Sequence, residues 1–340
     1  MKFGFHPVSQ SAGMLLGHSL GVGKKRLRKG HWLTEEDVQS LTSAGIDSVF
    51  AGTAEPDDIP ENTAAEQLAQ AIAGQELACE MPHTGRRNLI ALTDGLFCYD
   101  RGQAIALNAI DPRITAALLP PYSTVRRGDL VATIKIIPFA VPSALIDRSC
   151  ELARTPQLCQ VAPFLKSQAD FLETRLPAVK PLPEKVITFT TARAERVHLN
   201  IQSLEHCDHA PEEVSAWIKD VASSRADNAV LLIFGASATV DEADVIPAAI
   251  RLAGGTVDRV GMAADPGNLL VYGRLGTKHI IGLPGCAKSP ALNGFDWVLE
   301  RCAAGLTITP HDWAEMSVGG LLKEIEARPQ LRQPVPTLPP

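Results

Sequence analysis

The clearest pattern of apolar and polar positions lies in the second half of the chain. Residues 229–234 form an unbroken apolar run, which is typical of a strand in a parallel sheet covered by helices on both faces. A helix opened by Pro211 has apolar residues at positions i, i+3, i+4 and i+7, so one of its faces is expected to pack on that sheet. Further strands are predicted at 170–176, 198–204, 256–260 and from 279, and further helices at 187–196 and 294–305. This alternation predicts a doubly wound α/β domain with a mostly parallel sheet.

Shorter elements precede that domain. The sequence Thr34-Glu35-Glu36-Asp37 is close to a capping box and predicts a helix that stops at Gly45, followed by a strand at 46–51. An alanine-rich helix reaching about Ala73 is expected to bridge rather than to anchor a core. Short apolar runs at 88–91, 95–99, 104–107 and 130–137 are broken by Gly, Asp and Pro, and they predict strands of a β-rich domain. A helix at 143–154 is expected to lead into the α/β domain.

The expected organisation therefore has four parts. A small α+β segment occupies residues 1–75, a β-rich domain 76–142 and the α/β domain 143–328. The proline-rich end, 329–340, is expected to be disordered.

Composition excludes several classes of protein. The net charge of the 340 residues is −6, and the one basic run, 24–29, is short and has no aromatic residues within it, so we expect a solvated loop rather than a nucleic-acid site. The seven cysteines are scattered without a Cys-x-x-Cys pair, which indicates reduced thiols rather than disulfides or structural zinc. No apolar run approaches the roughly 18 residues that span a bilayer, and the N-terminus lacks a signal sequence. We expect a cytoplasmic protein that does not bind membranes.

A glycine-containing loop follows the apolar strand at 229–234. Backbone N–H groups converge where a parallel strand ends in such a turn before a helix, so Gly235-Ala236-Ser237 predicts a phosphate site, with Ser237 and Thr239 as added donors. Asp241 and Asp244 come next, and these carboxylates are suited to Mg²⁺. The alternative is that Asp244 only caps the following helix.

Two more loops follow strands of the same domain. Asp265-Pro266-Gly267-Asn268 follows the strand at 256–260, and Leu283-Pro284-Gly285-Cys286 follows the strand that starts at 279. Lys288 and Ser289 lie just beyond the second turn, within reach of a phosphate or simply solvated. Cys286 is either a thiolate activated by a helix N-terminus or, as we favour, a small residue that fills a tight turn.

Two other polar clusters have plain structural alternatives. Cys207-Asp208-His209 contains metal-ligand residue types, but adjacent residues rarely all face one ion, so we favour a helix cap by Asp208. Arg86, in the loop after His83, is either a phosphate ligand or part of an ordinary hairpin.

The order of these loops resembles the molybdopterin-binding domain shared by molybdopterin adenylyltransferases and molybdopterin molybdotransferases. Residues 235–244 take the place of that family's Gly-Gly-x-Ser loop and its aspartates, and Gly282-Leu283-Pro284-Gly285 matches its Gly-Leu-Pro-Gly signature. Residues 33–49 are similar to a molybdotransferase segment. The chain is most similar to the molybdopterin-binding regions that are fused to molybdenum cofactor cytidylyltransferases.

The resemblance implies a ligand: a pterin dithiolene with a terminal phosphate, with Mg²⁺ held by a carboxylate. The sequence departs from the family at Ala236 and Ala238, at Asp265 and Asn268 where lysines are common, and at Cys286 in place of an asparagine. The expected ligand-binding residues are Gly235, Ala236, Ser237, Thr239, Asp265, Gly267, Asn268, Pro284, Gly285, Cys286, Lys288 and Ser289. Asp244 and Asp241 are the candidate catalytic residues, and Asp244 is the candidate metal ligand.

Two functions follow as hypotheses. The first is a molybdopterin-binding protein that inserts metal into the pterin or modifies it during molybdenum cofactor biosynthesis. The second is a non-catalytic carrier that presents the cofactor to a nucleotidyltransferase or a molybdoenzyme, which the missing lysines favour. A generic nucleotide-binding domain is disfavoured because no Gly-x-Gly-x-x-Gly turn occurs at Gly235. Self-association is also expected, for which an apolar helix such as the one at 294–305 could serve.

Overall fold

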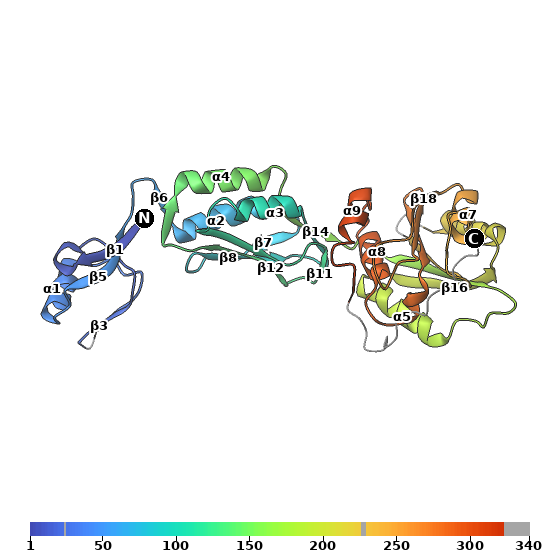
Figure 1. Ribbon diagram of the computed structural model, residues 1–340, viewed down its shortest axis with the longest axis horizontal. Coiled ribbons are helices and arrows are strands. Elements are labelled where there is room, and N and C mark those ends of the chain that lie inside the picture. The colour runs from blue at the N-terminus through green and yellow to red at the C-terminus, as the bar shows by residue number, and fades with distance from the viewer. Residues whose placement is uncertain (24, 226–228, 323–340) are drawn as a thin grey trace, which may run out of the picture. The chain divides into compact units, whose positions relative to one another are not determined.

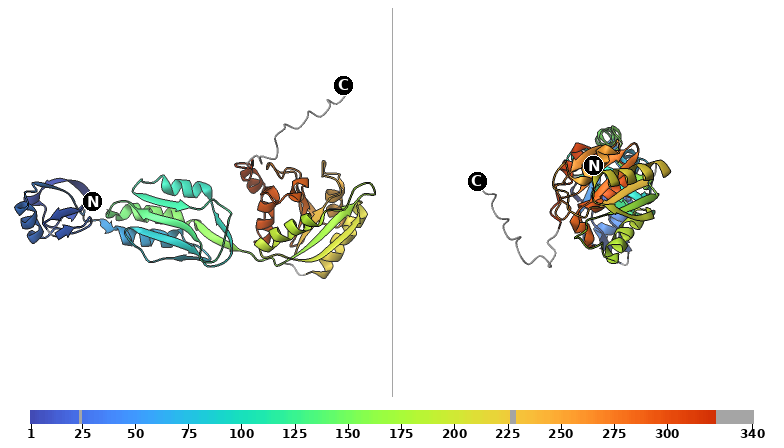
Figure 2. Two further views of the ribbon diagram at one scale, coloured as in Figure 1. Left: turned by 90° about the horizontal axis from the view of Figure 1, so that it is seen from below. Right: turned by 90° about the vertical axis from the view of Figure 1, so that its right-hand side faces the viewer.

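The computed structural model describes residues 1–23, 25–225 and 229–322, so the tail predicted to be disordered at 329–340 lies outside the described residues. The chain divides into two compact units, Met1–Pro163 and Phe164–Pro340. Figures 1 and 2 trace the first unit from blue to green and the second from yellow-green to red.

A six-stranded sheet forms the centre of the second unit, in the order β16-β15-β17-β20-β19-β18. Strand β19 is antiparallel to both of its neighbours, and the other five strands run in one direction. The mixed α/β class with a mostly parallel sheet is therefore confirmed. The strands are β15 (Gln168–Arg175), β16 (Asn200–Asp208), β17 (Ala229–Phe234), β18 (Thr256–Val260), β19 (Val271–Leu275) and β20 (Lys278–Leu283).

Helices cover both faces of this sheet. Along β17, Val230, Leu232 and Phe234 join the core on one face, whereas Leu231 and Ile233 join the core on the other. This explains the unbroken apolar run, because both sets of side chains are buried. The first core includes α5 (Glu184–Arg196), α8 (Gly294–Ala303) and α9 (Pro310–Glu315), and the second includes α6 (Pro211–Ser224) and α7 (Val245–Leu252).

Helix α8 is enclosed by the second unit. Nine of its ten residues are buried, and Trp297 is partly buried. This helix is therefore not available for self-association, because its apolar surface already packs inside the unit, and self-association itself stays a prediction.

The start of the first unit matches the predicted helix and strand. Thr34 and Asp37 form a complete capping box at the start of α1 (Glu35–Ser43). The described part of the basic run lies in or next to the β3–β4 hairpin. The Lys25 ammonium in this hairpin pairs with the buried Asp37 of α1 at 2.9 Å. The other elements are β1 (Lys2–Pro7), η1 (Val8–Gln10), β2 (Leu15–Leu16), β3 (Leu20–Val22), β4 (Lys25–Leu27) and β5 (Ser48–Thr53).

Two predictions for the rest of the first unit are wrong. Residues 104–107 belong to helix α3 (Arg101–Asn108), because Asp100 accepts a hydrogen bond from the Gln103 backbone N–H and caps a helix there. Helix α2 (Glu61–Ile72) anchors the core instead of bridging, since Leu68 and Ile72 are fully buried. Its alanines bring it close to its neighbours, including α4 (Ser143–Arg154).

Because α4 packs on α2, the observed division at Pro163 differs from the expected domain boundary at 142/143.

The sheets in the rest of the first unit have the orders β10-β12-β8-β7, β11-β9-β14 and β13-β6. Their strands are β6 (Asp58–Pro60), β7 (Leu77–Cys79), β8 (Arg86–Ala91), β9 (Gly95–Tyr99), β10 (Ile114–Leu118), β11 (Ser123–Val125), β12 (Leu130–Ile136), β13 (Ala140–Pro142) and β14 (Cys159–Pro163).

All seven cysteines are free thiols. Within the described ranges, no helix has both the length and the apolar character needed to cross a bilayer.

A buried histidine in β20 makes the stability of the second unit depend on pH. His279 lies with Nδ1 2.8 Å from the Tyr272 hydroxyl, and burial lowers its pKa from 6.5 to about 4. The unfolded chain therefore takes up a proton at a higher pH than the folded chain does. Stability is expected to fall by about 3 kcal/mol as the pH drops from 6.5 to 4.

Urea unfolding at pH 7 and pH 4.5 tests this expectation. His279→Asn, whose amide oxygen can still accept from Tyr272, should lose less stability between the two pH values than the wild type loses. His311→Gln, at an exposed position, should behave like the wild type. Equal losses in the wild type and in His279→Asn would contradict the prediction.

Candidate functional site

Three loops meet at one edge of the six-stranded sheet. Strands β17, β18 and β20 run in the same direction, so the loops that follow them leave from their shared carboxyl edge. After β17 the chain passes to α7 on one face, and after β20 it passes to α8 on the other. Such a divergence opens a crevice in α/β sheets, and ligands commonly bind there.

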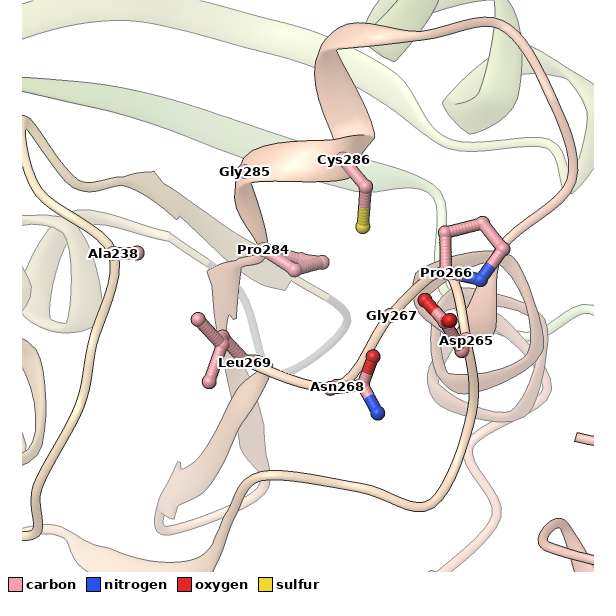
Figure 3. A pocket seen from close by; sticks show the side chains of 9 residues that line it. All are labelled: Ala238, Asp265, Pro266, Gly267, Asn268, Leu269, Pro284, Gly285 and Cys286. Atoms are coloured by element: carbon pink, nitrogen blue, oxygen red, sulfur yellow. The ribbon is translucent and has the colours of Figure 1, made fainter. Parts of the chain in front are cut away.

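A cavity of about 590 Å³ occupies this place. Its size is that of a typical site for a small molecule. Figure 3 shows it between the turn that contains Pro284 and the loop from Asp265 to Leu269, with the Cys286 side chain pointing from the turn towards that loop. It is lined by Ala238, Asp265, Pro266, Gly267, Asn268, Leu269, Pro284, Gly285 and Cys286.

The connection after β20 does not pass directly into an α-helix. Residues Gly285–Lys288 form a single 3₁₀ turn, and the α-helix starts only at Gly294, where Asn293 and Asp296 form a capping box. The alternative in which a helix N-terminus activates the Cys286 thiol is therefore wrong, because no α-helix starts there. Cys286 nevertheless lines the cavity, and its role in ligand binding stays a prediction.

A buried arginine that no sequence pattern predicted holds this turn. Arg193 of α5 is 4% exposed, and its Nε donates to Asp296 Oδ1 at 2.8 Å. Its two Nη atoms donate to the carbonyl oxygens of Ala287, Ser289 and Ala291 at 3.3, 2.5 and 2.9 Å. Arg193 thus fixes the chain between the cavity and α8. The only sequence signal was an arginine at a position of α5 that proves to be buried.

Lys288 and Ser289 do not line the cavity. Lys288 is exposed, with Nζ 5.4 Å from the centre of the Phe234 ring. The Ser289 hydroxyl oxygen accepts a hydrogen bond from the Ala291 N–H at 3.2 Å, which stabilises the turn.

The loop between β18 and β19 packs against the start of α8. The Gly294 N–H donates to the Pro266 carbonyl oxygen at 2.9 Å, and Gly267 has a φ of 136°, in the region that favours glycine. A Cβ at Gly267 would lie 2.7 Å from the Gly294 nitrogen. This loop therefore needs glycine both for its backbone conformation and for its close approach to α8.

A carboxylate forms part of the cavity wall. The Asn268 amide is oriented so that its nitrogen faces two acceptors. This nitrogen donates to Asp265 Oδ1 at 3.2 Å and to the Ala264 carbonyl oxygen at 3.1 Å. The Asp265 backbone N–H donates to the Gly320 carbonyl oxygen at 2.8 Å. Asp265 is thereby fixed from its side chain and from its backbone.

The loop after β17 contributes only Ala238 to the cavity lining. Gly235, Ala236, Ser237 and Thr239 lie beside that residue in the chain, but none of them lines the cavity. The Ala236 N–H donates to Thr174 Oγ1 at 2.9 Å, Thr239 is buried and Ser237 is exposed. The predicted phosphate loop, residues 235–239, therefore borders the cavity and reaches it at Ala238.

The two aspartates proposed for catalysis bind the backbone. Asp244 caps α7, since its Oδ1 accepts from the Val245 N–H at 2.7 Å and its Oδ2 from the Val240 N–H at 3.0 Å. Asp241 Oδ1 accepts from the Ala243 N–H at 2.8 Å. In the part of the chain that the structure describes, no three His, Cys, Asp or Glu residues form a group able to hold a metal ion. The contacts of Asp244 match the cap interpretation, and a role of these carboxylates in binding Mg²⁺ stays a prediction.

The remaining sequence candidates have structural roles as well. Helix α6 has Ala210 as its N-cap without a side-chain hydrogen bond, so the expected cap by Asp208 is wrong. Its neighbour His209 instead lies with Nδ1 2.8 Å from Thr174 Oγ1. In the first unit, Arg86 exchanges two backbone hydrogen bonds with His83, as in the hairpin alternative.

Comparisons with known proteins give partial likenesses. A family model described as a domain of unknown function (DUF8806) matches residues 6–52, which lie outside the candidate site. A search of curated proteins finds no match.

Two solved structures are similar to the chain over 90% of its length. One is a molybdopterin biosynthesis MoeA protein from Pyrococcus horikosii, with a TM-score of 0.30, 12% identity and 75% of its length covered. The other is a molybdenum cofactor biosynthesis protein from Pyrococcus furiosus, with a TM-score of 0.24, 8% identity and 64% of its length covered. These scores and identities are low, so neither likeness places the chain in a family.

Proposed function

We propose that this protein binds molybdopterin, in the cavity at the carboxyl edge of the six-stranded sheet, and acts in molybdenum cofactor biosynthesis. The observation that carries the proposal is the convergence of two motif-bearing loops. Asp265-Pro266-Gly267-Asn268 and Pro284-Gly285-Cys286 lie on either side of the β19–β20 hairpin, and together they supply seven of the nine residues that line the cavity.

The chemistry of the lining suits a pterin with a sulfur-rich side chain. The aminopyrimidinone edge of a pterin has two adjacent N–H donors, which a carboxylate such as that of Asp265 accepts together. Pro266, Leu269 and Pro284 offer apolar surface to the flat ring. The thiol of Cys286 is a soft group of the kind that suits a metal held by a dithiolene. The ligand's phosphate would extend towards Ser237 and the backbone of the neighbouring loop.

A carrier role has more support than catalysis. Asp244 and Asp241 use their carboxylates to hold the backbone around α7, so no reaction step is assigned to them. Asp265 adds negative charge where the resembling enzymes have lysines, which weakens any site for a nucleotide-bearing ligand. We therefore infer that the protein presents the cofactor to a separate nucleotidyltransferase or molybdoenzyme.

Titration of the purified protein with molybdopterin tests the binding proposal. Ala238→Arg places a long side chain at the cavity wall and should weaken binding by at least about tenfold, or roughly 1.4 kcal/mol. Ala243→Arg lies on the same loop, is exposed and does not line the cavity, so it should bind like the wild type. No binding by the wild type, or equal binding by both variants, would contradict the proposal.

A second measurement separates the carrier from the enzyme. The protein is mixed with adenylylated molybdopterin and molybdate, and nucleotide release is followed. A carrier should bind molybdopterin without releasing nucleotide, whereas release that depends on the protein would favour the molybdotransferase-like alternative.

A further inference from the structure

A histidine of the Cys207-Asp208-His209 cluster lies beside the predicted phosphate loop without belonging to the three loops at the cavity. Strand β15 passes to α5 on one face of the sheet and β17 passes to α7 on the other, so the crevice continues between these neighbouring strands. Thr174 is near the carboxyl end of β15, and His209 directly follows β16. A Cβ at Gly235 would lie 3.8 Å from His209 Cε1, so the imidazole ring lies next to the start of the loop.

The hydrogen bonds of Thr174 set the position of the imidazole proton. Its Oγ1 accepts from the Ala236 N–H at 2.9 Å, which leaves one hydroxyl proton to donate. The two acceptors within reach are His209 Nδ1 at 2.8 Å and the Phe234 carbonyl oxygen at 3.4 Å. The shorter contact lies in the normal range for a hydroxyl donor and the longer one lies outside it. We therefore assign the hydroxyl as the donor to Nδ1, which places the proton of the neutral ring on Nε2.

The ring is neutral and keeps a donor for a ligand. Burial lowers the pKa of His209 below its ordinary value. The nearby Asp244 carboxylate raises this pKa by a smaller amount, so the imidazole carries no charge at neutral pH. Nε2 has no hydrogen-bond acceptor among residues 1–23, 25–225 and 229–322, and His209 is only partly buried. The Nε2–H group is thus available to a bound molecule.

We propose that His209 binds the phosphate of the ligand through Nε2–H, beside the backbone of Gly235-Ala236-Ser237, and that Thr174 positions the ring. This inference rests on the proposed molybdopterin site and adds a residue that recognises the phosphate. An uncharged donor suits a phosphate beside residues 235–244, which include no lysine or arginine, because hydrogen bonds to a phosphate are charge-assisted even from a neutral donor. Thr174 connects the loop to the ring through a single hydroxyl group.

Two substitutions at position 209 separate the donor from the rest of the side chain. His209→Gln keeps an amide N–H close to the place of Nε2, and His209→Asn keeps an acceptor close to Nδ1 but has no donor that reaches as far. We expect His209→Asn to weaken molybdopterin binding about tenfold and His209→Gln by no more than about threefold. Neither should change the binding of dephosphorylated molybdopterin. His206→Asn, at an exposed position of β16, is the matched control and should bind like the wild type.

The second measurement does not depend on molybdopterin. In full-length protein labelled with ¹⁵N-histidine, the imidazole nitrogen shifts of His209, assigned by their loss in His209→Asn, should report the Nε2–H tautomer. Thr174→Val should remove this preference. Inorganic phosphate should shift the Nε2 signal of His209 in the wild type. If phosphate or sulfate shifts the signals of the other histidines by the same amount, the binding is non-specific and the inference is overturned.

The outcomes distinguish the two proposals. If the wild type binds molybdopterin and His209→Asn binds it equally well, the role of His209 is wrong and the molybdopterin site stands. If the wild type does not bind molybdopterin, the proposed function fails, and the response of His209 to inorganic phosphate still decides whether this residue binds phosphate.

Discussion

Replacing Arg193 by methionine is expected to lower the free energy of unfolding of the second unit by about 3–5 kcal/mol. The substitution would leave the Asp296 carboxylate, which is 2% exposed, as a buried charge without its nearest cation. It would also remove the donors to the carbonyl oxygens of Ala287, Ser289 and Ala291. Each buried acceptor that loses its partner adds a desolvation cost of about 1–3 kcal/mol. Urea unfolding followed by circular dichroism measures the total.

Arg196 provides the matched control. It belongs to the same helix and lies 3.8 Å from the same carboxylate, but its side chain is 56% exposed. Arg196→Met should change stability by no more than about 1 kcal/mol. Hydrogen exchange should also speed up at residues 286–291 in Arg193→Met and remain unchanged in Arg196→Met. Similar effects of the two substitutions would contradict the assigned role of Arg193.

Gly267→Val is expected to destabilise the second unit by roughly 3 kcal/mol or more and to abolish ligand binding in the cavity. The backbone at this position has a φ of 136°, which L-residues rarely adopt. The added Cβ would approach the Gly294 nitrogen to 2.7 Å and its Cα to 2.9 Å, and both atoms are backbone that cannot simply rotate away. The loop would have to move off α8, which would displace Asp265 and Asn268 from the cavity wall. Thermal unfolding and molybdopterin titration measure the two effects.

Gly285→Ala tests whether the effect is specific. Gly285 lines the same cavity, but a Cβ there would meet no atom within 4 Å and its φ is not in the left-handed region. This variant should unfold within about 0.5 kcal/mol of the wild type, as expected for a substitution without strain. Equal destabilisation by the two substitutions would show that the close approach at Gly294 is not the cause.

The sequence predicted the parts of the site that depend on local patterns. The apolar run at β17 indicated a strand covered on both faces, and the glycine-containing turns after the strands indicated where Asp265, Gly267 and Pro284 would lie. Strand direction is enough to bring such turns to one edge. The cavity lining therefore contains residues from both of the last two predicted loops.

Tertiary contacts account for what the sequence did not predict. Arg193 lies 103 residues from Asp296, and the pairing of Thr174 with His209 depends on β15 and β16 being neighbours. Neither contact leaves a periodic or motif signal. The role of Asp244 remained open in the sequence because a helix cap and a metal ligand use the same residue type. Residues 104–107 were assigned to a strand because a four-residue apolar run suits a strand or a helix equally well.

The antiparallel direction of β19 has a consequence for how this cavity can change. In a wholly parallel sheet, the chain leaving β18 would need a crossover to reach its next strand. Because β19 runs back from the same edge, both ends of the 261–270 loop are fixed at the cavity. Insertions or deletions near its exposed residues Asn268 and Leu269 would reshape the binding surface while every strand kept its register. This loop is therefore where related chains could acquire a different ligand preference without a change of fold.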